Sequence, residues 1–180
     1  MGSATTPRER QTPKVKEIAG QEMNLLLDTT IMIDVVRFRN QRNELLAELV
    51  RAGHRLCTST LNIAELYVGI RAGESARIES LLSGLEYHEL SASIARLAGQ
   101  MRSIWAQKGR TLSLADTIVA ATAIDRGCAL LTDNRKDFRC RKCSCIRCRE
   151  GGQHRLRLEG FSMQYMTLPA SGRHNAPYRH

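Results

Sequence analysis

Short apolar runs separated by helical patterns constrain the fold of this chain more than any other feature. Leu25–Leu27 is one such run, and Cys128–Thr132 is another. Runs of this kind are typical of strands that are covered on both faces, as in a parallel sheet. Arg55–Thr58 and Glu86–Leu90 are further short strand candidates. The alternation of strands and helices predicts an α/β fold with a central parallel sheet between layers of helices.

Helical periodicity and capping residues define the expected helices. A repeat of 3.6 residues is clear in the longest of them, and Gly53 is expected to end the second one. Ser59 or Thr60 is expected to cap the third. The expected helices span Thr30–Arg37, Asn43–Ala52, Leu61–Ile70, Glu74–Leu82, Ser91–Lys108 and Leu114–Asp125.

Basic residues are concentrated at the C-terminal end. The formal net charge is +9, but residues 23–138 carry 14 basic and 13 acidic residues, a net of +1. Residues 139–180 carry nine basic and two acidic residues, a net of +7. The expected folded body is therefore nearly neutral. The basic tail suits a polyanion such as RNA, although basic tails are often only solvated.

Composition divides the chain into three parts. Residues 1–22 are polar and show no periodicity, so we expect a disordered N-terminal extension, with Met23 as the natural start of the fold. Residues 23–138 are expected to form one domain. Residues 139–180 are expected to be a divergent, basic, Cys-rich and largely irregular segment, in which Arg155–Phe161 could form a last edge strand.

The sequence favours a cytoplasmic protein without a membrane partner. No apolar stretch approaches the ~20 residues that a membrane span needs. The polar N-terminal residues also lack the apolar region of a signal peptide. In the cytoplasm, the six cysteines are expected to be thiols or metal ligands rather than disulfides.

Three acidic residues stand out by their positions. Asp28 directly follows the strand candidate Leu25–Leu27, whereas Glu65 and Asp116 each share a helical face with apolar residues. An isolated buried carboxylate is costly and tends to take up a proton or find a partner. The apolar residues are Leu61, Ala64 and Val68 beside Glu65, and Val119, Ala120 and Ala123 beside Asp116.

Each acid taken alone has a simpler explanation. Asp28 can be the N-cap of the following helix. Glu65 can lie at the rim of an apolar face and pair with an arginine. Asp116 can complete a capping box with Ser113. Asp137 can pair on the surface with a neighbouring basic residue.

Taken together, the acids predict a metal site. Asp28 and the segment 133–137 follow strand ends, and Glu65 and Asp116 lie in early helical turns, so all can meet at the carboxyl edge of a parallel sheet. Two carboxylates about 5 Å apart repel by roughly 3 kcal/mol at an effective dielectric constant of about 20. A divalent cation relieves this repulsion, and oxygen ligands suit Mg²⁺ or Mn²⁺, which commonly engage phosphate. The pattern therefore indicates phosphodiester hydrolysis.

The acids lie in four separate motifs. The motifs are Leu25-Leu26-Leu27-Asp28-Thr29-Thr30, Ser59-Thr60-x₄-Glu65-Leu66-x₂-Gly69, Leu114-Ala115-Asp116-x-Ile118-x-Ala120-Ala121 and Leu131-Thr132-x-Asn134-x₂-Asp137-Phe138. In this order and spacing, over Asn24 to Phe138, they resemble the PIN domain, most closely the VapC toxins, the ribonucleases of toxin–antitoxin pairs. The resemblance implies a PIN-like three-layer α/β/α sandwich with a central parallel sheet.

The resemblance also implies a Mg²⁺- or Mn²⁺-dependent endoribonuclease that hydrolyses RNA phosphodiester bonds. By position, Asp28, Glu65 and Asp116 would hold the metal. Asp137 would be the fourth catalytic acid, with Asn134 beside it as a further metal ligand. In the implied mechanism, the cation activates water for in-line attack and stabilises the leaving 3′ oxygen.

Other polar residues have lesser expected roles. Asp133 occupies a variable position of the last motif and ranks below Asp137. Thr29, Thr30 or Thr132 could orient water or a carboxylate. Three of the five histidines lie in the tail, which disfavours a histidine-dependent nuclease mechanism.

By the same resemblance, we expect a homodimer that binds a VapB-type antitoxin, whose C-terminal segment blocks the acidic site. Grooves between the early helices could accept such an amphipathic segment. The alternative is that the same apolar residues simply fill the core. They are Val35, Val36, Phe38, Leu45, Leu46 and Leu49.

The region after Phe138 departs from the family pattern of a short turn and a final strand. Cys140-x₂-Cys143 and Cys145-x₂-Cys148 resemble two zinc half-sites. Only one residue separates the pairs, so a four-cysteine site would be strained, and free thiols in a flexible basic segment are favoured. The segment is either an insertion before a last strand at His154–Glu159 or a divergent C-terminus.

Two other functions compete with the nuclease as explanations of these residues. A catalytically silent PIN-like protein that binds RNA or a partner is the alternative, but such a domain has no reason to keep four converging carboxylates. A phosphatase of the Asp-x-Asp type is disfavoured because Thr30 stands where the second Asp belongs. The sequence therefore favours the metal-dependent ribonuclease.

Overall fold

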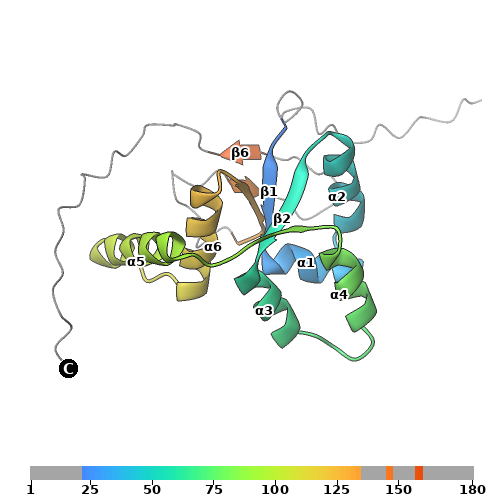
Figure 1. Ribbon diagram of the computed structural model, residues 1–180, viewed down its shortest axis with the longest axis horizontal. Coiled ribbons are helices and arrows are strands. Elements are labelled where there is room, and N and C mark those ends of the chain that lie inside the picture. Colours follow the sequence, from blue (N-terminus) through green and yellow to red (C-terminus); the bar gives the residue numbers. More distant parts are fainter. Residues whose placement is uncertain (1–21, 135–144, 148–156, 160–180) are drawn as a thin grey trace, which may run out of the picture.

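The computed structural model describes residues 22–134, 145–147 and 157–159 (Figure 1). These residues form strands β1 (Asn24–Leu27), β2 (Arg55–Ser59), β3 (Glu86–His88), β4 (Ala129–Thr132), β5 (Cys145–Arg147) and β6 (Arg157–Glu159). They also form helices α1 (Thr29–Val36), α2 (Arg42–Arg51), α3 (Thr60–Val68), α4 (Ser75–Leu82), α5 (Ala92–Gln107) and α6 (Leu114–Asp125).

The strands form one sheet in the order β3-β2-β1-β4-β5-β6. The strands from β3 to β5 run parallel to their neighbours, and β6 pairs antiparallel with β5. The central parallel sheet predicted from the sequence is therefore confirmed. Strand β6 falls inside the predicted strand Arg155–Phe161, whereas β5 lies in the Cys-rich segment, where no strand was predicted.

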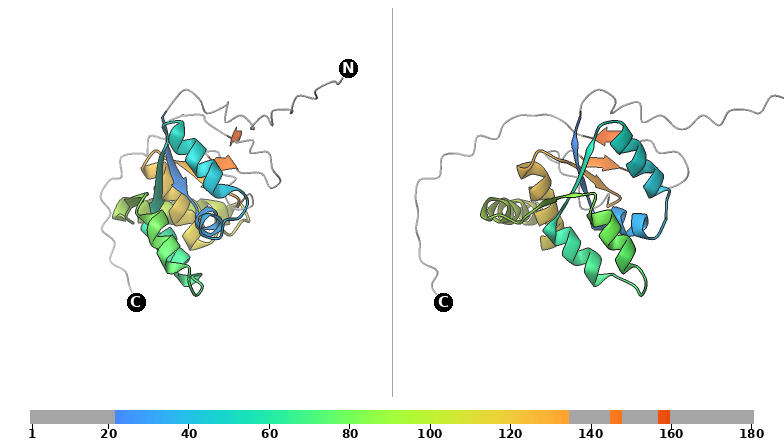
Figure 2. Two further views of the ribbon diagram at one scale, coloured as in Figure 1. Left: turned by 90° about the vertical axis from the view of Figure 1, so that its right-hand side faces the viewer. Right: turned by 45° about the vertical axis from the view of Figure 1, so that its right-hand side comes forward.

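Helices cover both faces of this sheet, which gives the expected three layers (Figures 1 and 2). Leu25 and Leu27 of β1 belong to a core cluster shared with α1, α2 and α4. Leu26 points to the opposite face, into a cluster shared with α6. This alternation explains why all three leucines are buried, since each face of β1 has its own layer of helices.

The helices begin close to the residues predicted from the sequence, because each N-cap contacts only the first turn of its own helix. Asp28, Ser59, Ser91 and Ser113 are the N-caps of α1, α3, α5 and α6. Each side chain accepts a hydrogen bond from a backbone N–H of the first turn. Among the described residues, no helix is both long enough and apolar enough to cross a membrane.

The predicted inward face of α3 is wrong in part. Ala64 is exposed and Val68 is 89% exposed, whereas Asn62 and Leu66 are buried. The reason is that α3 starts at the carboxyl end of β2 and its later turns run beyond the ends of the strands, where the sheet no longer covers them (Figure 1). Glu65 consequently lies at a partly buried position rather than inside an apolar stripe.

Several residues predicted from the sequence lie outside the described part of the chain. They include Asp137 and the tail cysteines Cys140, Cys143 and Cys148. The expected N-terminal extension also lies outside it, apart from its last residue, Glu22.

An ion pair joins α1 to the start of α4. The Nε atom of Arg37 lies 2.9 Å from Oε1 of Glu74, and its NH2 group donates to the carbonyl of Gly69. Glu74 also accepts a hydrogen bond from the backbone N–H of Arg71. The hydrogen bond from Arg37 is the main reason why the pKa of Glu74 falls to about 2.

The Arg37–Glu74 ion pair makes the free energy of unfolding depend on pH in the acidic range. Because the pKa of Glu74 is depressed in the fold, its contribution is present above the ordinary Glu value and is lost as the pH falls towards about 2. We expect the wild type to melt above Glu74→Gln at pH 7 and the two to converge near pH 2. Thermal denaturation across this range tests it, with the exposed Glu89→Gln as the control. A Tm difference that stays constant with pH would contradict the prediction.

Candidate active site

Asp28 lies at the carboxyl end of the central strand β1, in contact with β4. Its backbone N–H donates to the carbonyl of Leu131, and its Oδ2 accepts hydrogen bonds from Thr132 Oγ1 at 2.6 Å and Thr30 Oγ1 at 3.1 Å. Its Oδ1 accepts from the backbone N–H of Thr29 at 2.8 Å. The carboxylate is therefore both an N-cap and a side chain fixed at the sheet edge.

Burial raises the pKa of Asp28, because desolvation disfavours its charged form. The hydrogen bonds from Thr132, Thr30 and Thr29 lower the pKa and offset part of this effect. The charge of Asp116 raises it further. The structure thus brings Asp116 close enough to Asp28 for the two carboxylates to repel each other.

Glu65 reaches the same edge from α3 through a threonine. Thr29 Oγ1 donates a hydrogen bond to Glu65 Oε2 at 2.6 Å. The Oγ1 atom of Thr29 also accepts a hydrogen bond from Nδ2 of Asn62 at 2.9 Å. Asn62 is fully buried and is held in turn by Ser59, the N-cap of α3. This chain of contacts fixes Glu65 relative to Asp28, with Thr29 between them.

Asp116 lies in the first turn of α6 and is partly buried. Its backbone N–H donates to Ser113 Oγ at 2.9 Å, and its Oδ2 accepts from the same hydroxyl. Ser113 therefore caps α6 as expected, but the carboxylate of Asp116 accepts from the serine hydroxyl rather than from the backbone N–H that a full capping box uses. This contact leaves the second carboxylate oxygen of Asp116 without a hydrogen bond among the described residues, so capping and ligand binding are compatible.

Among residues 22–134, none of these three carboxylates forms an ion pair with Lys, Arg or His. Three acids near one another without a basic partner are unfavourable unless a cation or protons neutralise them. Their donor atoms are all oxygens, which suit a hard divalent cation. The ligand type therefore matches the metal that the sequence predicted, but among the described residues these three acids do not form a group whose ligand oxygens all lie within 4.8 Å of one another.

The end of β4 and the two residues after it supply three more of the predicted polar residues. Thr132 is buried, and its hydroxyl accepts a hydrogen bond from the backbone N–H of Asn134 at 3.0 Å while it donates to Asp28. Asp133 instead contacts the fully buried Arg42, with 2.5 Å between Oδ2 and NH2. This contact supports the lower rank given to Asp133 as a ligand.

Sequence reasoning missed Asn62. Ser59-x-x-Asn62 has the spacing of a capping box. The apolar periodicity of the helix, however, predicted no role for Asn62. The three threonines, by contrast, were expected to orient a carboxylate, and the structure shows Thr132 and Thr30 on Asp28 and Thr29 on Glu65.

Comparisons with known proteins agree with this geometry. The PIN domain family model matches residues 25–140. Ribonuclease VapC19 from Mycobacterium tuberculosis is 34% identical over 113 residues, which cover 63% of this chain and 90% of that protein. The tRNA(fMet)-specific endonuclease VapC of Shigella flexneri is 26% identical and covers 64% of this chain and 90% of its own length.

A solved structure shares the fold. VapBC2 from Rickettsia felis, determined bound to a DNA fragment from its promoter, superposes with a TM-score of 0.59 and 26% identity. The alignment covers 64% of this chain and 91% of that chain. The matched family model spans more than half of the sequence, including Asp28, Glu65 and Asp116. The chain therefore belongs to the PIN-domain family, with VapC ribonucleases as its relatives.

Proposed function

We propose that this protein is the endoribonuclease toxin of a VapBC-type toxin–antitoxin pair and that it hydrolyses RNA phosphodiester bonds with Mg²⁺ or Mn²⁺. One observation carries the proposal. Asp28, Glu65 and Asp116 gather at the carboxyl edge of the sheet without a basic partner among the described residues. The names of the similar proteins, ribonucleases and VapBC complexes, support it.

The cation site in this proposal uses the predicted acids. Asp28, Glu65 and Asp116 would hold the cation, and Asp137 and Asn134 are proposed as further ligands. When bound, such a cation makes water a better nucleophile and neutralises charge on the phosphate group. Since Asp137 lies outside the described residues, its place in the ligand set rests on its position in the motif.

The protein's own groups prepare this site. The hydroxyls of Thr132 and Thr30 and the N–H of Thr29 fix both oxygens of Asp28, so the carboxylate does not rotate when the substrate arrives. Thr29 also positions Glu65. Because these donors are neutral, they orient the acids without cancelling the negative charge that attracts the cation.

Removal of one acid tests the nuclease. We expect Asp28→Asn and Asp116→Asn each to lower RNA cleavage by more than about 100-fold, beyond the ~10–100-fold typical of a residue that only supports a ligand. Cleavage of structured RNA is measured with purified protein, with Mn²⁺ or with EDTA. Wild-type cleavage should stop in EDTA.

Asp125→Asn is the matched control, because Asp125 lies at the other end of α6 and contacts Arg126. It should cleave like the wild type. Full activity of Asp28→Asn, or cleavage that continues in EDTA, would refute the proposed mechanism. Retained RNA or partner binding without cleavage in the wild type would support the silent alternative.

Thr132→Val tests the support of Asp28. The substitution nearly keeps the volume of the buried side chain and removes both its hydrogen bond to Asp28 Oδ2 and the acceptor for the backbone N–H of Asn134. We expect cleavage or Mn²⁺ affinity to fall about 10–100-fold. Thr122→Val is the control, since Thr122 is also buried but donates to the carbonyl of Ile118 within α6. Equal losses in both variants would show that the effect is general destabilisation.

We further propose that a VapB-type antitoxin binds a groove between α1, α2 and α4. The groove has a volume of about 640 Å³, and Val35, Val36, Phe38 and Leu46 are among the residues that line it. Leu45 and Leu49, also predicted as groove residues, are fully buried and fill the core instead. The VapBC complexes among the similar structures support this partner. Homodimer formation is proposed on the family resemblance alone.

Two features of the groove rim suit an amphipathic peptide. Phe38 is 69% exposed and has a φ of 52°, a left-handed conformation that is uncommon for a bulky residue. The guanidinium of Arg77 lies 5.7 Å from the centre of its ring. Val50 adds a second exposed apolar side chain. An apolar floor beside exposed aromatic and basic groups is a common form of helix-binding groove.

A charge in the groove should therefore weaken partner binding. We expect Val50→Glu to lower the affinity for the cognate antitoxin at least about 10-fold, because the carboxylate would be desolvated at the interface. The control is Val68→Glu, at an exposed site on α3 that is not part of the groove. Calorimetric titration measures both. Unchanged affinity in Val50→Glu would place the partner elsewhere.

A further inference from the structure

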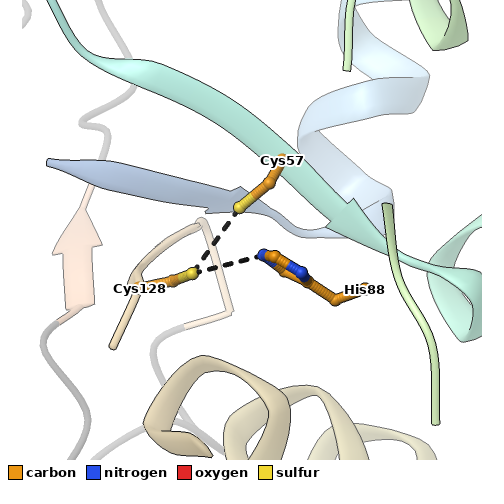
Figure 3. Close-up of side chains that lie close together, drawn as sticks. All are labelled: Cys57, His88 and Cys128. Carbon is orange, nitrogen blue, oxygen red and sulfur yellow. Dashed lines mark hydrogen bonds between the residues drawn. The ribbon is translucent and has the colours of Figure 1, made fainter. Parts of the chain in front are cut away.

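A second group of potential metal ligands lies away from the acidic edge. Cys57, His88 and Cys128 converge from three different elements (Figure 3). The two sulfur atoms are 3.7 Å apart, and Cys128 Sγ lies 3.6 Å from His88 Nε2. One ligand atom of each residue lies within 4.8 Å of the other two. These three residues form what we call the sulfur cluster.

The sheet register explains how the cluster forms. Cys57 of β2 pairs with Glu86 of β3, and His88 lies two residues further along β3. Residues two apart in a strand point to the same face, so His88 and Cys57 share one side of the sheet. Cys128 enters from the turn after α6, where Gly127 has a φ of 62° and the N–H of Cys128 donates to the carbonyl of Ala123.

The distances match those of a tetrahedral metal site. With Zn–S bonds of about 2.3 Å and Zn–N bonds of about 2.0 Å, two thiolates of a tetrahedron lie about 3.7 Å apart, and a thiolate and an imidazole nitrogen about 3.5 Å apart. The Cys57–Cys128 edge of 3.7 Å and the Cys128–His88 edge of 3.6 Å are close to these lengths, and the Cys57–His88 edge is within 4.8 Å. The three side chains therefore already lie near the positions of metal ligands.

A disulfide does not fit this geometry. Strand β1 lies between β2, which carries Cys57, and β4, which Cys128 precedes. Neighbouring strands are about 4.8 Å apart, so these backbones are separated by roughly 9–10 Å. A disulfide joins Cα atoms at about 4.4–6.8 Å. Bond formation would require the backbone to move.

Burial argues against a nucleophilic Cys–His pair. Cys57 is 1% exposed and Cys128 is 6% exposed, in a cluster with Leu26 and Val119. A nucleophile needs access to its substrate, whereas a structural metal ligand does not. A second cysteine is also superfluous in a catalytic pair but is needed in a metal site.

Cysteine binds a metal as the thiolate, so a cation at this cluster would displace the protons of both thiols, and its two positive charges would balance the two sulfur charges.

We propose that Cys57, Cys128 and His88 bind Zn²⁺ through two thiolates and one imidazole nitrogen, with water as the fourth ligand. Thiolate and imidazole ligands favour zinc over Mg²⁺ or Mn²⁺, so the sulfur cluster and the acidic edge select different cations. The zinc would tie the edge strand β3 to the turn between α6 and β4. Its role is to hold the sheet together.

The test uses the full-length chain with Cys140, Cys143, Cys145 and Cys148 replaced by serine, so that tail thiols do not bind the probe. Co²⁺ is titrated into this protein, and absorption is recorded. We expect thiolate-to-cobalt charge transfer that saturates at one equivalent and is displaced by Zn²⁺. Adding Cys57→Ala should abolish it, and adding His88→Gln should weaken Co²⁺ binding at least about 10-fold.

His88→Gln decides the outcome, because His88 is only partly buried and its replacement leaves both buried cysteines in place. Glu89→Gln is the control and should bind Co²⁺ like the parent. Far-ultraviolet circular dichroism confirms the fold of each variant. The proposal is overturned if the folded parent shows no charge transfer, if His88→Gln binds as tightly as the parent, or if mass spectrometry recovers a Cys57–Cys128 disulfide.

Discussion

The structure depends on one unfavourable arrangement, a carboxylate buried at the end of the central strand. Asp28 has lost most of its water, and its backbone is tied to β4. Neutral donors hold both of its oxygens, but among the described residues no basic group compensates its charge. A fold that keeps a carboxylate in this state has exchanged stability for a prepared binding site.

Features with a short-range cause were predictable from the sequence. The apolar runs of β1 and β4 indicated a sheet covered on both faces, and the N-caps set the starts of the helices. The inward face of α3 was mispredicted, because periodicity does not reveal where a helix leaves the sheet that it covers. Val68 shows this clearly, since an apolar residue at the expected position is almost fully exposed.

Features that depend on distant pairs were not predictable in the same way. Asn62 supports Thr29 from 33 residues away, and Arg42 contacts Asp133 from 91 residues away. Cys57, His88 and Cys128 have no common motif, because sheet register and a helix-ending turn bring them together. The acids of the proposed site could be predicted because they lie at the spacing of the family motifs. A single sequence contains no comparable signal for the sulfur cluster.

The order in which the sheet is made has a consequence for a toxic enzyme. Thr132 follows Asp28 by 104 residues, and β4 pairs directly with β1. A ribosome therefore completes β1 long before β4, the strand that lies beside it. The hydrogen bond that fixes Asp28 forms only after residue 132 has been added, so this edge of the sheet is assembled late in translation.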